Sequence, residues 1–109
     1  MEISYKNSQI RKLCTDEKSA RKLLGNNGAK RLSERLDQML TVPSLDKLFG
    51  TAGDWHELKG NRKGQFACKI TGSYRLVFEP NNDDYRKQDG GLDWSKIIAV
   101  MNIEIIDYH

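Results

Sequence analysis

Residues 55–79 read WHELKGNRKGQFACKITGSYRLVFE, and apolar side chains alternate with polar ones through most of this stretch. Alternation with a period of two is typical of strands that bury one face. We predict strands at 55–59, 66–70 and 74–79, joined by turns at 60–64 and 71–73. Strands joined by such short turns form an antiparallel meander, so these residues predict the central part of an antiparallel sheet.

The chain before this meander has a different period. A short strand is predicted over residues 1–6, and residues 8–41 have the 3.6-residue apolar spacing of helices, interrupted by Gly25-Asn26-Asn27-Gly28. Pro43 ends the last helix, and Ser44 begins a short helical turn that runs through Phe49. These helices are expected to cover one face of the sheet.

The chain after the meander contains a polar loop and a last strand. Residues 80–95 predict a mobile loop, and residues 97–106 predict a strand. Its expected core face consists of Ile97, Ala99, Met101, Ile103 and Ile105. Strict alternation sends His109 to that same face, so a bulge or bend near Asp107 is needed to bring His109 to an exposed cleft.

Length and composition indicate one globular domain over residues 1–109. Of the 109 residues, 38% are hydrophobic and 30% are charged. No apolar run approaches the roughly 18–20 residues that span a bilayer, and residues 1–6 lack the plan of a signal peptide. We therefore expect a cytoplasmic protein without membrane contact. Cys14 and Cys68 are far apart, which favours free thiols over a disulfide, and the spacing of cysteines and histidines disfavours a metal site.

Charge is distributed unevenly along the chain, although the net charge is only +3. The segment from Lys59 to Arg75 contains five cations and no acid, whereas the segment from Glu79 to Asp93 contains five acids. A basic centre followed by an acidic stretch predicts a localised anion site. Charged strand faces exposed to solvent are the alternative interpretation.

The polar residues suit metal-free cleavage of RNA. No glycine-rich phosphate loop, activated Ser or Cys, or acidic magnesium cluster is recognisable. Attack by a 2′-hydroxyl on the adjacent phosphate needs a proton acceptor, a proton donor and cations near the phosphate. The candidates that supply such groups are His56, Lys59, Arg62, Lys63, Arg75, Tyr108 and His109. Each also has a structural interpretation, as an ordinary sheet residue, a solvated lysine or an ion-pair partner.

Three motifs resemble the HigB-type branch of the RelE/ParE toxin superfamily. They are residues 55–66, residues 74–78 and the stretch Ile105-Ile106-Asp107-Tyr108-His109. The family pattern is close to His-Pro-Leu-Lys-Gly-(Asp/Asn)-Arg-x-Gly, an aromatic-Arg-Ile/Leu strand and a terminal Asp-Tyr-His. The resemblance is specific over about 54–79 and 105–109, and only architectural over 1–50. It implies a RelE-like α+β fold, with a small twisted antiparallel sheet and N-terminal helices on one face.

The resemblance also implies a function. It predicts the toxin of a type II toxin–antitoxin pair, an endoribonuclease that cleaves mRNA in the ribosomal A site without a cofactor. Carried over by position, His109 is the main acid/base candidate and His56 shares proton transfer. Lys59 and Arg75 stabilise phosphate charge, and Tyr108 positions the substrate. Arg62 and Lys63 are expected to contact RNA backbone less specifically.

The resemblance also implies partners, and it leaves alternatives. The expected partners are mRNA, the ribosome and a helix-turn-helix antitoxin, with operator DNA contacted only through the antitoxin. Glu57 departs from the family's Pro and adds a negative charge beside the predicted site, and the loop 80–95 is longer and more acidic than in compact members. The alternatives are a ParE-like inhibitor that binds DNA gyrase, which needs no acid/base pair, and an inactive RNA-binding relative.

Overall fold

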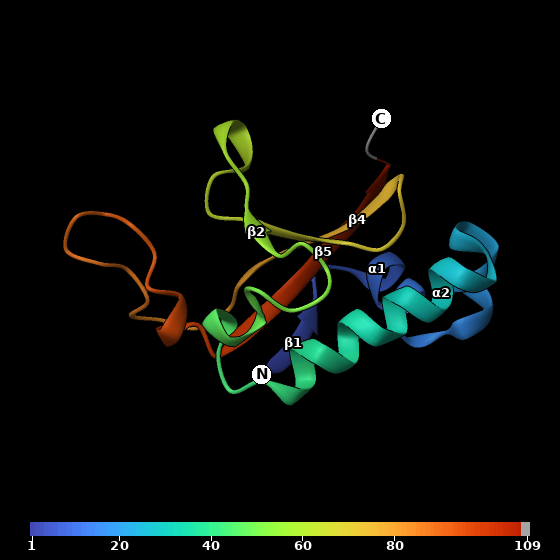
Figure 1. The fold of residues 1–109 in the computed structure, drawn as a ribbon, viewed down its shortest axis with the longest axis horizontal. Coiled ribbons are helices and arrows are strands. Elements are labelled where there is room, and N and C mark those ends of the chain that lie inside the picture. The colour runs from blue at the N-terminus through green and yellow to red at the C-terminus, as the bar shows by residue number, and fades with distance from the viewer. Residues whose placement is uncertain (108–109) are drawn as a thin grey trace.

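The computed structural model describes residues 1–107 and contains one five-stranded sheet (Figure 1). Its strands are β1 (Glu2–Tyr5), β2 (His56–Glu57), β3 (Phe66–Lys69), β4 (Tyr74–Pro80) and β5 (Ala99–Asp107), in the order β1-β5-β4-β3-β2. The α+β class and the antiparallel meander β2-β3-β4 are confirmed. The sheet is mixed and not purely antiparallel as predicted, because β1 pairs parallel with β5. Side-chain alternation carries no information on strand direction, which explains this error.

Two helices precede the meander: α1 (Ser8–Thr15) and α2 (Glu17–Thr41). The side chain of Asn7 caps α1 by accepting a hydrogen bond of 3.0 Å from the Ile10 amide. The predicted interruption is a kink in α2 at Gly25, where φ is +76°. The short turn predicted after Ser44 is a 3₁₀ helix, Leu45–Leu48. No helix within residues 1–107 combines the length and apolarity needed to cross a bilayer.

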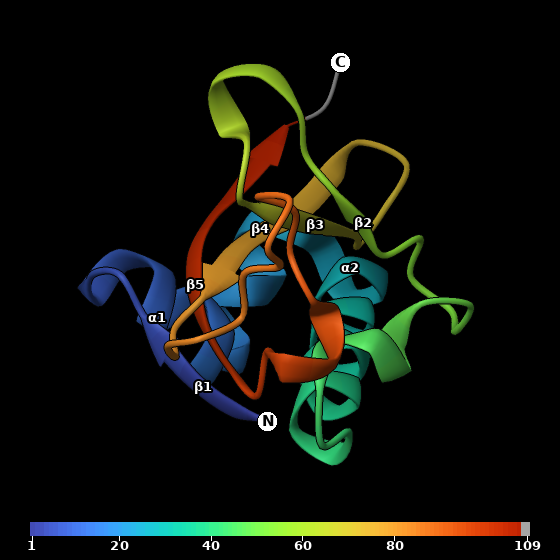
Figure 2. The ribbon, with the colours of Figure 1, turned by 90° about the vertical axis from the view of Figure 1, so that its left-hand side faces the viewer.

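The main core lies between the helices and one face of the sheet, which we call the inner face (Figure 2). The residues of β3 and β4 on this face are Phe66, Cys68, Leu76 and Phe78, each 0% exposed. The rings of Phe66 and Phe78 stack with centroids 5.8 Å apart. The alternation predicted for β3 and β4 is therefore confirmed, and it sends Lys69 and Arg75 to the opposite face, which we call the outer face.

A β-bulge changes the direction of side chains in β5. Val77 pairs with Glu104 but Phe78 pairs with Asn102, so Ile103 is the extra residue. Val100 before the bulge packs into the main core, whereas Ile103 packs with Val77 on the outer face. The core face predicted for the first half of β5 is therefore wrong. The predicted break near Asp107 concerns Tyr108 and His109, which lie outside the described residues.

The segment predicted as a mobile loop contains a hairpin with defined anchors. Within it, the Asp93 amide donates to the Tyr85 carbonyl over 2.7 Å. Asn82 accepts hydrogen bonds from the amides of Ile98 (3.0 Å) and Ala99 (3.2 Å). Trp94, which follows the hairpin, stacks on Phe49 with ring centroids 3.7 Å apart. The prediction of a mobile loop rested on the polar composition of residues 80–95, which does not indicate these hydrogen bonds or the ring stacking.

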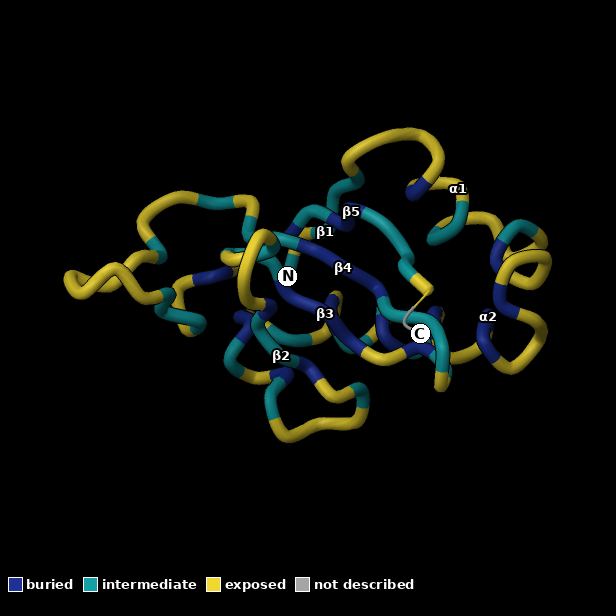
Figure 3. The backbone as a smooth tube through the Cα atoms, turned by 90° about the horizontal axis from the view of Figure 1, so that it is seen from above, coloured by how far each residue is buried: buried dark blue, intermediate teal, exposed yellow. Residues whose placement is uncertain are grey.

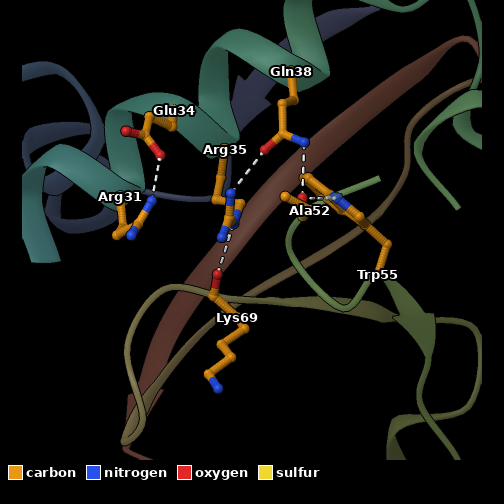
Figure 4. A network of polar contacts seen from close by, with 7 residues as sticks. All are labelled: Arg31, Glu34, Arg35, Gln38, Ala52, Trp55 and Lys69. Atoms are coloured by element: carbon orange, nitrogen blue, oxygen red, sulfur yellow. Dashed lines mark hydrogen bonds and ion pairs between the residues drawn. The ribbon is translucent and has the colours of Figure 1, made fainter. Parts of the chain in front are cut away.

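A buried arginine joins α2 to the sheet (Figure 4). Arg35 is 8% exposed, and its Nε donates to the carbonyl of Lys69 over 2.8 Å. Its Nη1 donates to the side chain of Gln38 over 3.0 Å, and Gln38 donates to the carbonyl of Ala52 over 2.8 Å. Trp55 Nε1 donates to the same carbonyl over 3.0 Å. Arg35 therefore fixes the end of β3, and through Gln38 it is connected to the turn that leads into β2.

We expect Arg35→Ala to lower the free energy of unfolding by about 2–3 kcal/mol, because it removes charged hydrogen bonds and leaves buried acceptors with fewer donors. Arg31→Ala is the matched control on the exposed face of α2, where the Arg31–Glu34 ion pair lies in solvent. This control should change stability by less than about 1 kcal/mol. Urea unfolding followed by circular dichroism measures both, and equal effects of the two substitutions would contradict the role of Arg35.

Both cysteines are free and carry raised thiol pKa values. Burial raises the pKa of Cys14 from 9.0 to about 11, and burial raises that of Cys68 to about 12. The Asn102 amide donates toward the sulfur of Cys14 over 3.8 Å and opposes part of that rise. Because thiolate is the reactive form, the raised pKa values predict low reactivity of both thiols at neutral pH in the folded chain.

We expect native protein at pH 8 to react slowly with a thiol reagent, and unfolded protein to react fast at both cysteines. The folded pKa values exceed the unfolded value of 9.0, so the stabilisation from these buried thiols is complete below pH 9 and is lost as pH rises through about 11 and 12. Labelling of Cys14→Ser and Cys68→Ser variants assigns each signal. Fast labelling of the folded protein at pH 8 would refute this prediction.

Candidate functional site

Three basic side chains share the outer face of the sheet, opposite the helices. The strand register places His56 beside Ala67, and places Lys69 beside Arg75, which in turn pairs with Ile106. These two cross-strand rows are adjacent on one face, because residues two apart in a strand point the same way. From strand spacing, the Cα atoms of His56 and Arg75 are about 12 Å apart, within reach of a ligand that touches both side chains.

Residues 58–65, which we call the arm, lie over the same face. The arm begins and ends at a hydrogen bond of 2.8 Å from the Leu58 amide to the Gln65 carbonyl, and it contains the short 3₁₀ helix Gly60–Arg62. Leu58 packs on the outer face with Val77 and Ile103. Figures 1 and 2 show the arm and the end of β5 on the side of the sheet away from α2. Seen from above, β3 and β4, whose central residues are buried, run between the arm and the end of β5 (Figure 3).

Arg62 holds the arm against β5. Its Nη2 forms an ion pair with Glu104, and its Nη1 donates to the Gln65 side chain over 2.9 Å. Both partners of the pair are partly exposed. The sequence predicted Arg62 as a contact for RNA backbone, and the structure gives it an intramolecular carboxylate partner instead of an open guanidinium.

The other cations predicted on the arm are exposed. Lys59 and Lys63 both extend from it into solvent. Lys63 lines a cavity of about 410 Å³ between the arm and the 85–93 hairpin, together with Glu57, Arg86 and Leu92. The sequence placed Lys59 among the site residues. In the structure Lys59 precedes the short turn that contains Arg62, and the Arg62 amide donates to the Lys59 carbonyl over 3.3 Å.

Arg75 is held at the turn between β3 and β4. Its Nη1 donates to the carbonyls of Thr71 (2.7 Å) and Tyr74 (3.1 Å). The neighbouring Lys69 is exposed and is absent from the set predicted from the sequence. The sequence did contain a signal for Lys69. Lys69 alternates with the apolar residues Cys68 and Ile70, as Arg75 does with Leu76, and this alternation predicts that Lys69 lies on the same face as Arg75.

His56 and Glu57 point to opposite faces of the sheet. Nδ1 of His56 lies 2.7 Å from the carbonyl oxygen of Asp54. Glu57 pairs with Phe66 on the inner face and accepts a hydrogen bond of 3.2 Å from Trp94 Nε1. The carboxylate expected to add charge beside the site is therefore directed away from His56.

The end of β5 completes the described part of the site. Asp107 pairs with Tyr74, next to the pair formed by Arg75 and Ile106. Tyr108 and His109 follow Asp107 in the sequence but lie outside the described residues. Within residues 1–107 no three His, Cys, Asp or Glu side chains form a group that could hold a metal ion.

Comparisons with known proteins establish the fold. No protein-family model matches the sequence, and no curated protein matches it. Among solved structures, a YoeB/ParE toxin from Agrobacterium tumefaciens is similar, with a TM-score of 0.61 and 14% identity over 100% of both chains. A chain of the YoeB-YefM complex from Staphylococcus aureus has a TM-score of 0.59 and 16% identity, over 100% of this chain and 97% of that one. The chain has the fold of these two structures, which confirms the RelE-like architecture expected from the motifs.

We expect the Arg62–Glu104 pair to couple the arm to β5 by about 0.2–1 kcal/mol, the range of exposed ion pairs. A double-mutant cycle with Arg62→Ala and Glu104→Ala, read by urea unfolding, measures this coupling. The cycle Arg21→Ala with Glu17→Ala serves as the control, because that pair lies on one helix and leaves the arm untouched. Additive effects of the Arg62 and Glu104 substitutions would show that the pair does not hold the arm.

Proposed function

We propose that this chain is the toxin of a type II toxin–antitoxin system, of the HigB-type branch, and that it cleaves mRNA on the ribosome in the cytoplasm. The observation that carries the proposal is the shared outer face. His56 and Arg75 lie there in adjacent cross-strand rows, and Arg75 pairs with the strand that leads into Tyr108 and His109. The fold shared with the YoeB chains supports the same class of protein.

The proposed chemistry uses side chains alone. His56 and His109 exchange protons with the 2′-hydroxyl and the departing 5′-oxygen, since an imidazole can both accept and donate a proton. Arg75 and Lys59 stabilise negative charge on the phosphate in the transition state. Tyr108 positions the substrate by stacking or by hydrogen bonding. The set requires no cofactor, because it supplies both proton transfers and the cations.

Positive charge around this face fits a polyanionic substrate. Lys63 and Lys69 are exposed cations on the arm and on β3. Such cations bind RNA backbone and help place the scissile phosphate, without reading sequence. Arg62 joins them only when RNA phosphate displaces Glu104 from its guanidinium, so we assign it a weaker role in RNA binding than the two lysines.

The proposal includes partners besides mRNA and the ribosome. One of the similar solved structures is a YoeB-YefM complex, which supports a dedicated protein partner for this chain as well. We propose that this partner is a helix-turn-helix antitoxin, and that the chain contacts operator DNA only through it.

The proposal predicts that the wild-type chain, incubated with programmed ribosomes, produces defined mRNA cuts that primer extension maps. His109→Ala and His56→Ala should each slow single-turnover cleavage about 10²- to 10⁴-fold, the contribution of a positioned acid or base. Arg75→Ala should slow it about 10²- to 10³-fold. Lys59→Ala and Arg75→Ala should change ribosome binding less than cleavage.

The matched control is Lys96→Ala. Lys96 is an exposed cation of the 3₁₀ helix Trp94–Lys96, which is not part of the candidate site on the outer face. It should leave cleavage unchanged. Inhibition of DNA supercoiling by gyrase, with no RNA cut, would replace the proposal with the ParE-like alternative. Ribosome binding without cleavage by the wild-type chain would identify an inactive relative.

A further inference from the structure

The turn before β2 has an uncommon backbone conformation. Asp54 has φ of +50°, and within residues 1–107 only Asp54 and Asp84 combine positive φ with a side chain. Left-handed backbone is unfavourable for residues other than glycine, and Asp and Asn tolerate it best. Such a conformation persists where the surrounding structure determines it.

The neighbours of Asp54 impose this conformation. The carbonyl of Gly53 accepts a hydrogen bond of 2.7 Å from the Lys69 amide. A Cβ on Gly53 would lie 2.7 Å from Trp55 Nε1 and 2.9 Å from Arg35 Nε, so only glycine fits there. Trp55 on the other side of Asp54 is 6% exposed. Asp54 thus lies between a glycine held by a backbone hydrogen bond and a buried tryptophan.

The consequence falls on His56. The carbonyl oxygen of Asp54 lies 2.7 Å from Nδ1 of the ring. A carbonyl oxygen only accepts hydrogen bonds, so Nδ1 carries the hydrogen. In the neutral ring the lone pair is then on Nε2, because neutral imidazole has one donor and one acceptor nitrogen.

We propose that Asp54 is a positioning residue, whose left-handed backbone fixes His56 in the Nδ1–H tautomer and makes Nε2 the proton acceptor for RNA cleavage. This inference rests on the proposed function and assigns the acceptor within it. Nε2 takes the proton of the 2′-hydroxyl, the 2′-oxygen bonds to phosphorus, and the bond from phosphorus to the 5′-oxygen breaks. That oxygen leaves with a proton from a second group, the role that remains for His109.

The test combines nitrogen-15 NMR of the histidine rings, in protein without RNA, with single-turnover cleavage on ribosomes. Asp54→Val disfavours the left-handed conformation, whereas Asp54→Asn and Asp54→Gly tolerate it. Asp84→Val is the matched control, because it opposes the same backbone conformation at φ of +63° in the segment before the 85–93 hairpin. Circular dichroism and thermal unfolding verify that each variant folds.

We expect wild type, Asp54→Asn, Asp54→Gly and Asp84→Val to show the Nδ1–H tautomer of His56 and to cleave within about threefold of one another. Asp54→Val should show a mixture of tautomers and cleave about 10- to 100-fold more slowly, short of the full loss on removing a general base. If Asp54→Val fails to fold, the inference is still tested. It is overturned by an Nε2–H tautomer in the wild-type chain, or by cleavage rates of Asp54→Asn and Asp54→Gly that differ from wild type by more than about threefold.

An Nε2–H tautomer in the wild-type chain overturns the inference, whatever the activity. Equal tautomer and rate in Asp54→Val and wild type also overturn it. If the wild-type chain shows the Nδ1–H tautomer and cuts no RNA, the proposed function fails and the acceptor role of His56 fails with it. The positioning of the ring by Asp54 is then upheld if Asp54→Val still shows a mixture of tautomers, so the two failures are distinguishable.

Discussion

The hydrogen bond from the Arg35 guanidinium to the Lys69 carbonyl connects the helical layer to the sheet at the point where β3 ends. A charged group that is almost buried must keep its partners, because losing them leaves a desolvated charge. Arg35 therefore fixes where α2 lies on the sheet, and its contact with Gln38 extends the constraint to the turn before β2. On the other side of the sheet, the Lys69 side chain stands beside Arg75. One residue thus belongs to the packing of the core through its backbone and to the candidate site through its side chain.

The two faces of the sheet have different degrees of cover. Both helices, α1 and α2, pack on the inner face. Within residues 1–107, the outer face is covered only where a small apolar cluster lies around Leu58 and Val77. The arm supplies that cover and is held by the pair between Arg62 and Glu104. Cations near the edge of this cluster face solvent. The same strands therefore contribute to the packed core on the inner face and to the polar candidate site on the outer face.

The sequence was sufficient for the features that repeat along the chain. The alternation in β3 and β4 predicted their core residues, and the helical period predicted helix over 8–41 with an interruption that begins at Gly25, but not the break at Asp16 between α1 and α2. It was insufficient where one residue breaks a pattern, as at the bulge of Ile103. Pairings between distant segments were hidden as well, including β1 with β5 and Arg62 with Glu104. The φ angle of Asp54 follows from its packed neighbours, so no local motif predicts it.

The parallel pairing of β1 with β5 has a consequence for the order in which the protein forms during synthesis. β1 has β5 as its one neighbour in the described sheet, and Glu2 pairs with Ala99. Almost a hundred residues are therefore synthesised after β1 before its partner β5 leaves the ribosome. Closing so long a loop is entropically unfavourable, and contacts distant in sequence slow folding. The helices and the meander can form early, but the sheet acquires its full width, and the outer face its complete set of strands, only as a late step.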